Sequence, residues 1–211
     1  MHSIAIFGGT FDPIHNGHLN ISNAIQNFFN FDSYLFLPCK IPTLKPPAFA
    51  SNQQRIEMLE LALKDYPQFK IDLREINRLS PSYMVDTLQS FRKEYRNDSI
   101  TLIMGYDAFT SLPQWHQWDK IIKLANLLII NRVDCLKHPP QEPINQLITN
   151  HKNNSKDVLL HSMAGVINFF DAGNYTISST DIRKRIQLHQ SVNNKLPNKV
   201  YDYIKRMKLY Q

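Results

Sequence analysis

Short apolar runs alternate along this chain with longer segments in which apolar residues recur at helical spacing. The short runs have the length and composition of buried strands, and residues 69–73 instead alternate between apolar and polar positions, as a strand also does. The predicted strands cover residues 4–7, 34–38, 69–73, 100–104, 127–130 and 166–170. Helical spacing predicts helices with apolar positions between 19 and 29, 56 and 63, and 85 and 91, and further helices over 107–112, 115–124, 179–188 and 197–207.

The helix starts carry recognisable signals. Ser51 is predicted to cap the second helix, and Ser80-Pro81-Ser82 to open the third, because serine caps and proline in the first turn both suit a helix start. Residues 133–163 are polar, and we expect a mobile loop and one modest helix there, without placing either.

Alternation of strands and helices predicts an α/β fold: a Rossmann-like, doubly wound parallel sheet with helices on both faces. We expect one domain over residues 1–211, with a small C-terminal helical part over about 179–211. Ligands of such sheets bind at the carboxyl ends of the strands, where the strand order reverses. Gly8, Gly9 and Gly105 each follow a predicted strand, so all three should lie at that edge.

Composition narrows the range of functions. The chain has 211 residues, is 43% hydrophobic and carries a formal charge of +6, which suits a single core and a polyanionic ligand. No basic run is interleaved with aromatic residues, so we do not expect nucleic-acid binding. Cys39 and Cys135 form no metal or disulfide pattern, and no signal peptide or long apolar span is present. We therefore expect a cytoplasmic protein without a membrane partner.

The stretch after the first strand offers candidate chemistry. Gly8 and Gly9 permit a sharp turn and close approach of a ligand, and His15 and His18 then stand where a helix begins. A helix N-terminus is a natural anion site, and residues three apart share a helix face. The stretch fits neither the P-loop nor the dinucleotide fingerprint. Two alternatives remain at this point: a capped helix with two surface histidines, and a zinc site, which lacks nearby partners at ligand spacing.

Residues 8–18, GGTFDPIHNGH, resemble the GGTFDPxHxGH pattern of the nucleotidyltransferases that carry the HxGH motif. The resemblance implies that this stretch binds ATP. It implies that His18 contacts the α-phosphate and His15 the neighbouring phosphates. The ATP-binding residues implied by this stretch are Gly8, Gly9, Thr10, Phe11, His15 and His18.

Residues 177–183, ISSTDIR, form a second candidate phosphate site. Ser178 or Ser179 can cap the helix, and Arg183 stands one turn further on with a forked guanidinium. An ordinary capped helix with a surface arginine is the alternative. The segment resembles the ISSTxIR segment of the same superfamily, which implies that Ser179, Thr180 and Arg183 hold the β- and γ-phosphates and that Arg183 is catalytic.

Two further places concern the nucleosides. Gly105 and Asp107 resemble the family's GxD beside adenosine, although Asp107 could instead cap a short helix. The helix start at Tyr83 and Met84 offers N–H groups to a carboxylate, and Trp115 could stack on a cationic pyridinium. Trp118 is expected to pack on the core. The resemblance assigns six residues to the second substrate: Lys45, Tyr83, Met84, Trp115, His116 and Arg132.

Taken together, the motifs resemble those of nicotinate-nucleotide adenylyltransferases in their order along the chain. This resemblance implies adenylyl transfer from ATP to nicotinate mononucleotide, giving nicotinate adenine dinucleotide and pyrophosphate in NAD synthesis. Mg²⁺ would accompany ATP, and no dedicated protein metal site is expected. The family pattern is altered at Cys39, Leu44, Met84 and Val133, all on the mononucleotide side or its rim.

Other functions remain open at this point. A sister enzyme could prefer nicotinamide mononucleotide, whereas the pantetheine phosphate enzymes are shorter and lack the tryptophan feature. A non-catalytic nucleotide-binding regulator would keep the ATP side alone. A nucleic-acid module would use the basic final fifty residues, which we instead interpret as the solvated side of an amphipathic helix. The oligomeric state, monomer or homodimer, is left open.

Overall fold

The computed structural model describes residues 1–211 except 43, 45, 80, 131–140 and 174. Within the described residues, six parallel strands form one sheet in the order β3-β2-β1-β4-β5-β6. The strands are β1 (Ser3–Gly9), β2 (Ser33–Pro38), β3 (Phe69–Ile71), β4 (Ser99–Gly105), β5 (Asn126–Ile130) and β6 (Ile167–Phe170). All six predicted strands are therefore confirmed, with bounds that differ by up to two residues.

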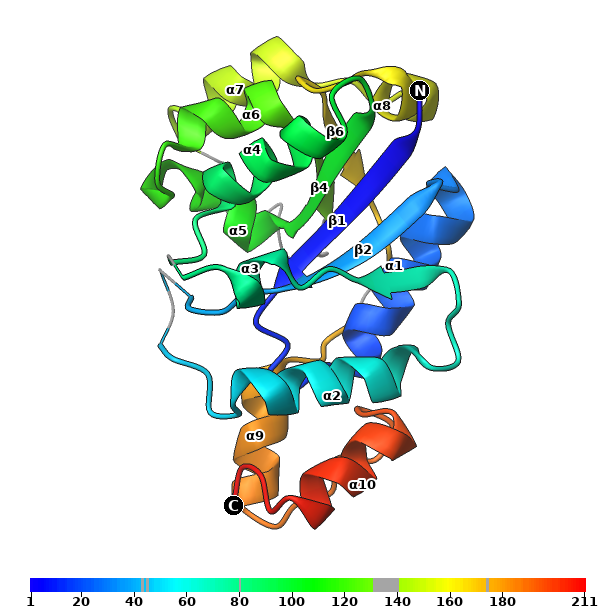
Figure 1. Cartoon of the computed structure of the whole chain (residues 1–211), viewed down its shortest axis with the longest axis vertical. Helices are drawn as coiled ribbons and strands as arrows, with labels where there is room; N and C mark the ends of the chain where they lie inside the picture. Colours follow the sequence, from blue (N-terminus) through cyan, green and yellow to red (C-terminus); the bar gives the residue numbers. More distant parts are fainter. Residues whose placement is uncertain (43, 45, 80, 131–140, 174) are drawn as a thin grey trace.

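Helices cover both faces of this sheet (Figure 1). They are α1 (Asn16–Phe29), α2 (Asn52–Leu63), α3 (Arg74–Asn77), α4 (Met84–Glu94), α5 (Tyr106–Thr110), α6 (Ile121–Leu124), α7 (Ile144–His151), α8 (Lys156–His161), α9 (Ser179–Gln187) and α10 (Asn198–Arg206), with 3-10 turns η1 (Leu112–Gln114) and η2 (Trp118–Lys120). The predicted doubly wound α/β fold is confirmed.

Two apolar clusters explain why the helices divide between the faces. Successive side chains of a strand point to opposite sides, so Ile4 and Ile6 pack with α4, α6 and α7, whereas Ala5 packs with α1, α2, α9 and α10. The strands other than the edge strand β3 are buried on both sides, which accounts for their continuous apolar runs, whereas Lys70 of β3 is exposed. In Figure 1, β1 runs from the N-terminus at the top toward the middle, and α2, α9 and α10 form the lower end.

Helix starts agree with the sequence in one case and differ in another. Ser51 caps α2: its hydroxyl accepts from the Gln54 N–H, and the Gln54 side chain accepts from the Ser51 N–H. The third predicted helix, by contrast, begins only at Met84, because Tyr83 keeps extended backbone angles and serves as the N-cap. The prediction that Ser80-Pro81-Ser82 opens this helix was wrong, and Ser80 itself lies outside the described residues.

Two other predicted elements also differ. The helix predicted over 115–124 begins only at Trp118, as η2 followed directly by α6, because Gln117 before it adopts a left-handed conformation with φ of 49°. The polar stretch over 133–163 holds two helices in its described part, α7 and α8, rather than one. Each buries a single apolar residue, Ile144 and Leu159, which is too sparse a pattern to be read from sequence.

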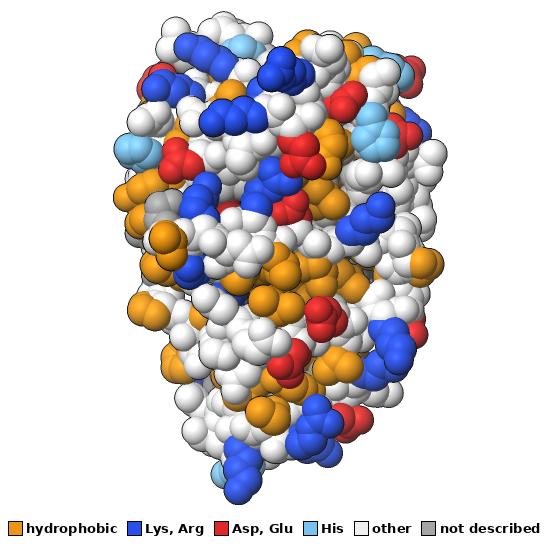
Figure 2. All heavy atoms as spheres, in the orientation of Figure 1, with side chains coloured by type: hydrophobic (Ala, Val, Ile, Leu, Met, Phe, Trp, Pro, Cys, Tyr) orange, Lys and Arg blue, Asp and Glu red, His pale blue; other side chains and the backbone are white. Residues whose placement is uncertain are grey.

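The surface is mixed in charge. Figure 2 shows Lys and Arg side chains spread over the face it presents, interspersed with Asp, Glu and hydrophobic side chains. None of the helices in the described part of the chain has both the length and the apolar composition that crossing a bilayer requires.

Candidate active site

The centre of the sheet brings the predicted glycines to one edge. β1 and β4 are neighbours, and Ser3 pairs with Ser99 and Phe7 with Ile103, so Gly9 and Gly105, each two residues further on, stand level. The strand order reverses between these two strands, which is where open α/β sheets bind ligands. A Cβ on Gly105 would meet nothing within 4 Å, whereas one on Gly8 would lie 3.3 Å from Met84 Cε. The edge is therefore open at Gly105 and closely packed at Gly8.

His15 and His18 form the cap of α1. The His15 Nδ1 accepts from the His18 N–H and the His18 Nδ1 accepts from the His15 N–H, each at 3.3 Å. The two rings stack with centroids 3.6 Å apart. His15 is only 5% exposed and His18 is half-buried. The alternative of two surface histidines is therefore wrong, although both do cap the helix.

This reciprocal cap decides how the rings are protonated. A nitrogen that accepts a hydrogen bond cannot carry a proton, so each neutral ring holds its proton on Nε2. Both rings then carry an Nε2–H donor. The Asn16 N–H at the helix start already donates to the Lys195 carbonyl, and the His18 N–H donates to His15, so the ring donors are what this cap contributes toward the oxygens of a phosphate chain.

Gly17 allows the start of α1, which carries the two histidines, to pack closely against residues 177–183, the second candidate phosphate site. A Cβ at this position would lie 3.0 Å from His15 Nδ1 and 3.3 Å from Ile177 Cβ. Any larger residue would push the start of α9 away from the start of α1 or displace the His15 ring. The glycine of the HxGH motif therefore has a packing reason in this chain.

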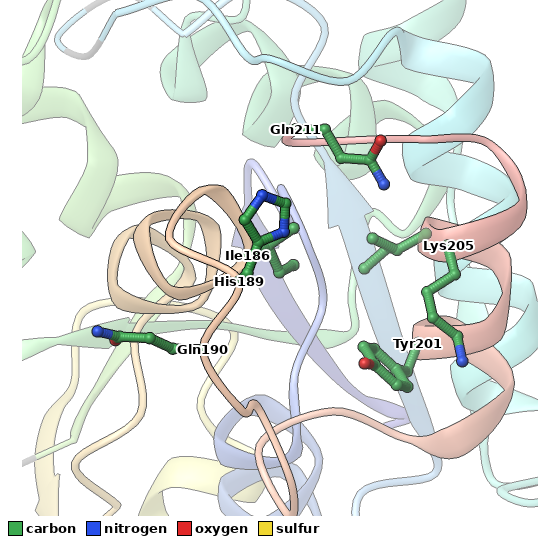
Figure 3. A pocket seen from close by; sticks show the side chains of 7 residues that line it. Ile186, His189, Gln190, Tyr201, Lys205 and Gln211 are labelled. Carbon is green, nitrogen blue, oxygen red and sulfur yellow. The ribbon is translucent and has the colours of Figure 1, made fainter.

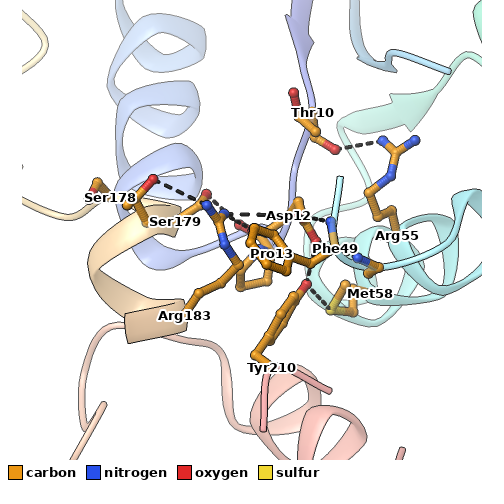
Figure 4. A network of polar contacts seen from close by, with 12 residues as sticks. Thr10, Asp12, Pro13, Phe49, Arg55, Met58, Ser178, Ser179, Arg183 and Tyr210 are labelled. Carbon is orange, nitrogen blue, oxygen red and sulfur yellow. Dashed lines mark hydrogen bonds and ion pairs between the residues drawn. The ribbon is translucent and has the colours of Figure 1, made fainter. Parts of the chain in front are cut away.

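The loop between β1 and α1 is held by three side chains from two distant segments, α9 and α2 (Figure 4). Arg183 Nη1 donates to the Asp12 carbonyl at 2.6 Å, and Ser179 Oγ donates to the Pro13 carbonyl at 2.9 Å. Arg55 Nη1 donates to the Thr10 carbonyl at 2.6 Å. These bonds fix the backbone of the motif loop.

The start of α9 is thereby placed against the start of α1. Ser178 is the N-cap, with its hydroxyl accepting from the Asp181 N–H, so the choice between Ser178 and Ser179 is settled. Arg183 Nη2 also lies 3.3 Å from Thr180 Oγ1, and its guanidinium carbon lies 4.8 Å from the Phe49 ring centroid. The three side chains predicted to share one triphosphate therefore stand around one loop.

Other predicted ATP-side residues lie around the same edge. The Phe11 side chain is buried and contacts the His18 ring edge-to-face at 5.2 Å, so any contact of Phe11 with ATP would use its backbone. Asp107 lies in the first turn of α5, and Gly105 holds the N-cap position. The alternative that Asp107 caps this helix is wrong.

The mononucleotide-side residues are brought together only in part. The Tyr83 and His116 rings lie 4.5 Å apart, and Met84 reaches Gly8 as noted above. Trp115 is half-buried against the apolar cluster of α4 and α6, and Trp118 packs on that cluster as predicted. Lys45, Arg132, Val133 and Cys135 lie outside the described residues.

Buried polar groups support the start of α4. Thr87 Oγ1 donates to Glu75 Oε1 at 2.6 Å, and Arg78 Nη2 donates to Thr87 Oγ1 at 2.9 Å. Burial raises the pKa of the Glu75 carboxyl, which is 2% exposed. Ser82 Oγ accepts from the Lys40 N–H at 3.0 Å, which joins the segment after β2 to the segment before α4.

Sequence reasoning missed three residues of this site. Arg55 is fully buried and also donates to the Cys39 carbonyl at 2.7 Å and to Asn52 Oδ1 at 2.6 Å. Its position on the apolar face of α2 was a signal that could have been used. The buried Asp12 carboxylate and Tyr210 carried no such signal. Asp12 is typical of a turn, and Tyr210 continues the apolar side of the last predicted helix.

Two cavities of the described structure lie away from this edge. One of about 230 Å³ lies between α9 and α10 and is lined by Ile186, His189, Gln190, Tyr201, Ile204, Lys205 and Gln211 (Figure 3). Another of about 290 Å³ lies beside Asn16, Tyr66 and Lys199. Neither is lined by a residue predicted to bind substrate. Among the described residues, no group of three or more His, Cys, Asp or Glu could hold a metal ion, so the zinc alternative gains no support.

Comparison with known proteins assigns the family. Residues 6–185 match the cytidylyltransferase-like family model. The chain is 59% identical over 211 residues to "Probable nicotinate-nucleotide adenylyltransferase" of Legionella pneumophila (strain Lens), covering 100% of both chains. It is 38% identical to the protein of the same name from Methylococcus capsulatus (strain ATCC 33009 / NCIMB 11132 / Bath), covering 98% of this chain and 99% of that one.

A solved structure supports the fold. The Plasmodium falciparum nicotinic acid mononucleotide adenylyltransferase complexed with NaAD aligns with a TM-score of 0.75 at 20% identity, covering 100% of this chain and 98% of that one. The chain therefore belongs to the cytidylyltransferase-like family and, within it, to the nicotinate-nucleotide adenylyltransferases.

Proposed function

We propose that this protein transfers the adenylyl group of ATP to nicotinate mononucleotide, giving nicotinate adenine dinucleotide and pyrophosphate, a step in NAD biosynthesis. The observation that carries the proposal is the stacked His15–His18 pair at the start of α1, placed against Arg183 and the start of α9. Family membership and close relatives of that name support it.

The ATP side follows from this geometry. The triphosphate lies between the starts of α1 and α9, with the Gly8–Phe11 backbone beneath it. His18 donates to the α-phosphate and His15 to the neighbouring phosphates. Ser179, Thr180 and Arg183 hold the leaving pyrophosphate. A guanidinium has five N–H donors, and Asp12 O and Thr180 Oγ1 engage two of its nitrogens here, which leaves donors for phosphate oxygens.

The reaction needs little acid–base chemistry. The nucleophile is a phosphate oxygen of the mononucleotide, already ionised at neutral pH. It attacks the α-phosphorus in line and forms a new P–O bond, while the bond to the oxygen that bridges to the β-phosphate breaks and its electrons leave with pyrophosphate. Catalysis is then mainly positioning and stabilisation of developing charge, which the fixed donors supply.

The adenosine of ATP lies beside Gly105 and Asp107. On the mononucleotide side, the Met84 N–H at the start of α4 binds the nicotinate carboxylate. The Tyr83 N–H, which donates to the Pro81 carbonyl at 2.9 Å in the structure, exchanges that bond for the carboxylate. Trp115 and His116 cover the pyridinium, and Lys45 and Arg132 supply positive charge. Methionine at position 84, where the family pattern differs, is compatible with this role, because the group that binds the carboxylate is the backbone N–H and not the side chain.

Mg²⁺ enters as part of the ATP substrate. It commonly keeps several waters and binds through substrate phosphates and one or two carboxylates. Its role would be to offset phosphate charge, and the residues named above would orient the phosphates that carry it. We also propose that residues 1–211 work as one domain, because Ile182 and Val200 of the C-terminal helices pack in the same apolar cluster as Ala5 of β1.

A coupled assay for pyrophosphate tests the proposal. The protein is incubated with ATP, Mg²⁺ and, in turn, nicotinate mononucleotide, nicotinamide mononucleotide and pantetheine phosphate. We expect the highest kcat/KM with nicotinate mononucleotide. A higher value with nicotinamide mononucleotide would identify the sister activity, and absence of pyrophosphate with every acceptor would indicate a non-catalytic nucleotide-binding regulator.

A further inference from the structure

The Asp12 carboxylate is the point where four segments meet (Figure 4). It is 3% exposed and belongs to the motif loop. Its Oδ2 accepts from the Phe49 N–H at 2.8 Å, its Oδ1 accepts from the Ala50 N–H at 3.2 Å, and Arg183 Nη1 lies 3.9 Å from Oδ2. This one side chain therefore joins the motif loop to the segment before α2 and to α9.

Tyr210 supplies the shortest of these contacts from the far end of the chain. Its hydroxyl donates to Asp12 Oδ1 at 2.6 Å, across 198 residues of sequence. The Tyr210 side chain is buried, and its Oη also lies 4.0 Å from Met58 Sδ. Burial and the adjacent Asp12 carboxylate raise the pKa of Tyr210, so the hydroxyl stays protonated and keeps donating.

We propose that Tyr210 is a positioning residue for adenylyl transfer: its hydroxyl holds the Asp12 carboxylate, and through it the motif loop and Arg183, in the arrangement that receives ATP. The proposal rests on the proposed function for its substrates. Tyr210 is not a catalytic residue, because it acts through Asp12 rather than on the reacting atoms.

The geometry shows why Arg183 depends on this hydroxyl. Arg183 Nη1 donates at 2.6 Å to the Asp12 carbonyl but lies 3.9 Å from the Asp12 carboxylate. Without the Tyr210 hydroxyl, the buried carboxylate loses a strong donor, and the guanidinium is the nearest charged replacement. A closer Arg183–Asp12 ion pair would draw the guanidinium away from the phosphates and shift the loop that carries Thr10.

The test compares Tyr210→Phe with Tyr34→Phe. Tyr34 is a matched control because it is also buried and its hydroxyl donates to Ser22 Oγ at 2.9 Å, a bond outside the site. Steady-state kinetics are measured with ATP and with nicotinate mononucleotide varied in turn. Calorimetry gives the Kd for ATP, and thermal unfolding gives Tm for each variant.

We expect Tyr210→Phe to lower kcat/KM for ATP about tenfold, as loss of a hydrogen bond to a charged group does, and to raise the Kd for ATP. The KM for nicotinate mononucleotide should change less than twofold. Tyr34→Phe should lower Tm without this effect on ATP. In an Arg183→Lys background, Tyr210→Phe should cost much less than tenfold, because the two residues act through one arrangement.

A different pattern would overturn the proposal. If Tyr210→Phe lowers Tm as Tyr34→Phe does but leaves kcat/KM and Kd for ATP within twofold of the unaltered protein, Tyr210 has a purely structural role. If the effects of Tyr210→Phe and Arg183→Lys on kcat/KM for ATP are fully additive, the same conclusion follows. Failure of the proposed function is a separate result, because it is seen as absence of turnover in the unaltered protein, while the Kd for ATP still reports on Tyr210.

Discussion

The two substrate sides of the sheet edge are built differently. On the ATP side, the motif loop is tied by Arg55, Arg183 and Ser179 through backbone carbonyls, and its own Asp12 is buried. On the mononucleotide side, Leu44 is 52% exposed, and Tyr83, Met84 and Trp115 are only half-buried. The difference teaches that the half proposed to bind ATP is held by buried polar contacts, whereas the half proposed to bind the mononucleotide presents partly exposed side chains.

Preorganisation has a physical value on the ATP side. Donors that are already fixed where charge develops need no rearrangement during the reaction, and such donors are often the largest single contribution to catalysis. Loss of a donor on the ATP side should therefore lower kcat, whereas loss of a contact on the mononucleotide side should raise the KM for nicotinate mononucleotide.

The largest expected effect is that of His18→Ala. Loss of a preorganised donor to developing charge should lower kcat by about 10²–10³, or about 2.7–4 kcal/mol in the barrier. The variant also removes the acceptor for the His15 N–H, so the free energy of unfolding should fall by about 1 kcal/mol. Steady-state kinetics and thermal unfolding measure the two effects.

His161→Ala is the control for this variant. His161 is exposed at the end of α8, whose Leu159 carbonyl contacts Ser99 at the start of β4, so it lies at the opposite end of the sheet. Its removal should leave kcat unchanged. Near-full turnover in His18→Ala would exclude His18 from the mechanism and remove the contrast between the two sides.

A smaller effect is expected for Trp115→Ala. Loss of the stacking surface should raise the KM for nicotinate mononucleotide by about tenfold, since a desolvated cation–π contact contributes about 1–2 kcal/mol, and should change the KM for ATP little. Trp118→Ala is the matched control and should lower Tm without raising that KM. An effect confined to the KM for ATP would show that Trp115 belongs to the other side.

The smallest effect is expected for Glu75→Gln, under the start of α4. Because burial raises the pKa of Glu75 above its ordinary value of 4.5, the folded state binds this proton more tightly than the unfolded state. The contribution of this proton to the free energy of unfolding is therefore fully present below that value and is lost as the pH rises through the raised pKa. Gln keeps an acceptor for Thr87 Oγ1 and does not titrate.

The Tm of Glu75→Gln, relative to wild type, should therefore increase between pH 4 and pH 8. Glu60→Gln, which alters an exposed side chain of α2, is the control and should show a smaller change. A relative Tm for Glu75→Gln that is independent of pH would argue against the raised pKa, and with it the buried support of the mononucleotide side.

Local patterns predicted much of the fold and some of the site. Continuous apolar runs predicted five strands, because a strand buried on both faces needs no other signal, and alternation predicted the edge strand β3. Irregular segments escaped prediction where one residue decides the path, as Gln117 does between η1 and η2. In the site, the roles assigned to His15, His18 and Arg183 remain predictions, while their common location is a property of the structure.

The sequence by itself determined the six strands, the start of α2 at Ser51 and the motifs assigned to phosphate binding, because periodicity, capping and glycine position act over a few neighbouring residues. Only the tertiary structure decided that Arg55 crosses to Thr10 and Cys39 and that Tyr210 reaches Asp12. Such contacts depend on how distant segments pack against the sheet, and the hydrogen bonds they form leave no periodic trace in the chain. For that reason sequence reasoning missed Arg55 and Tyr210, although it had named Arg183 and Ser179, which also hold the motif loop.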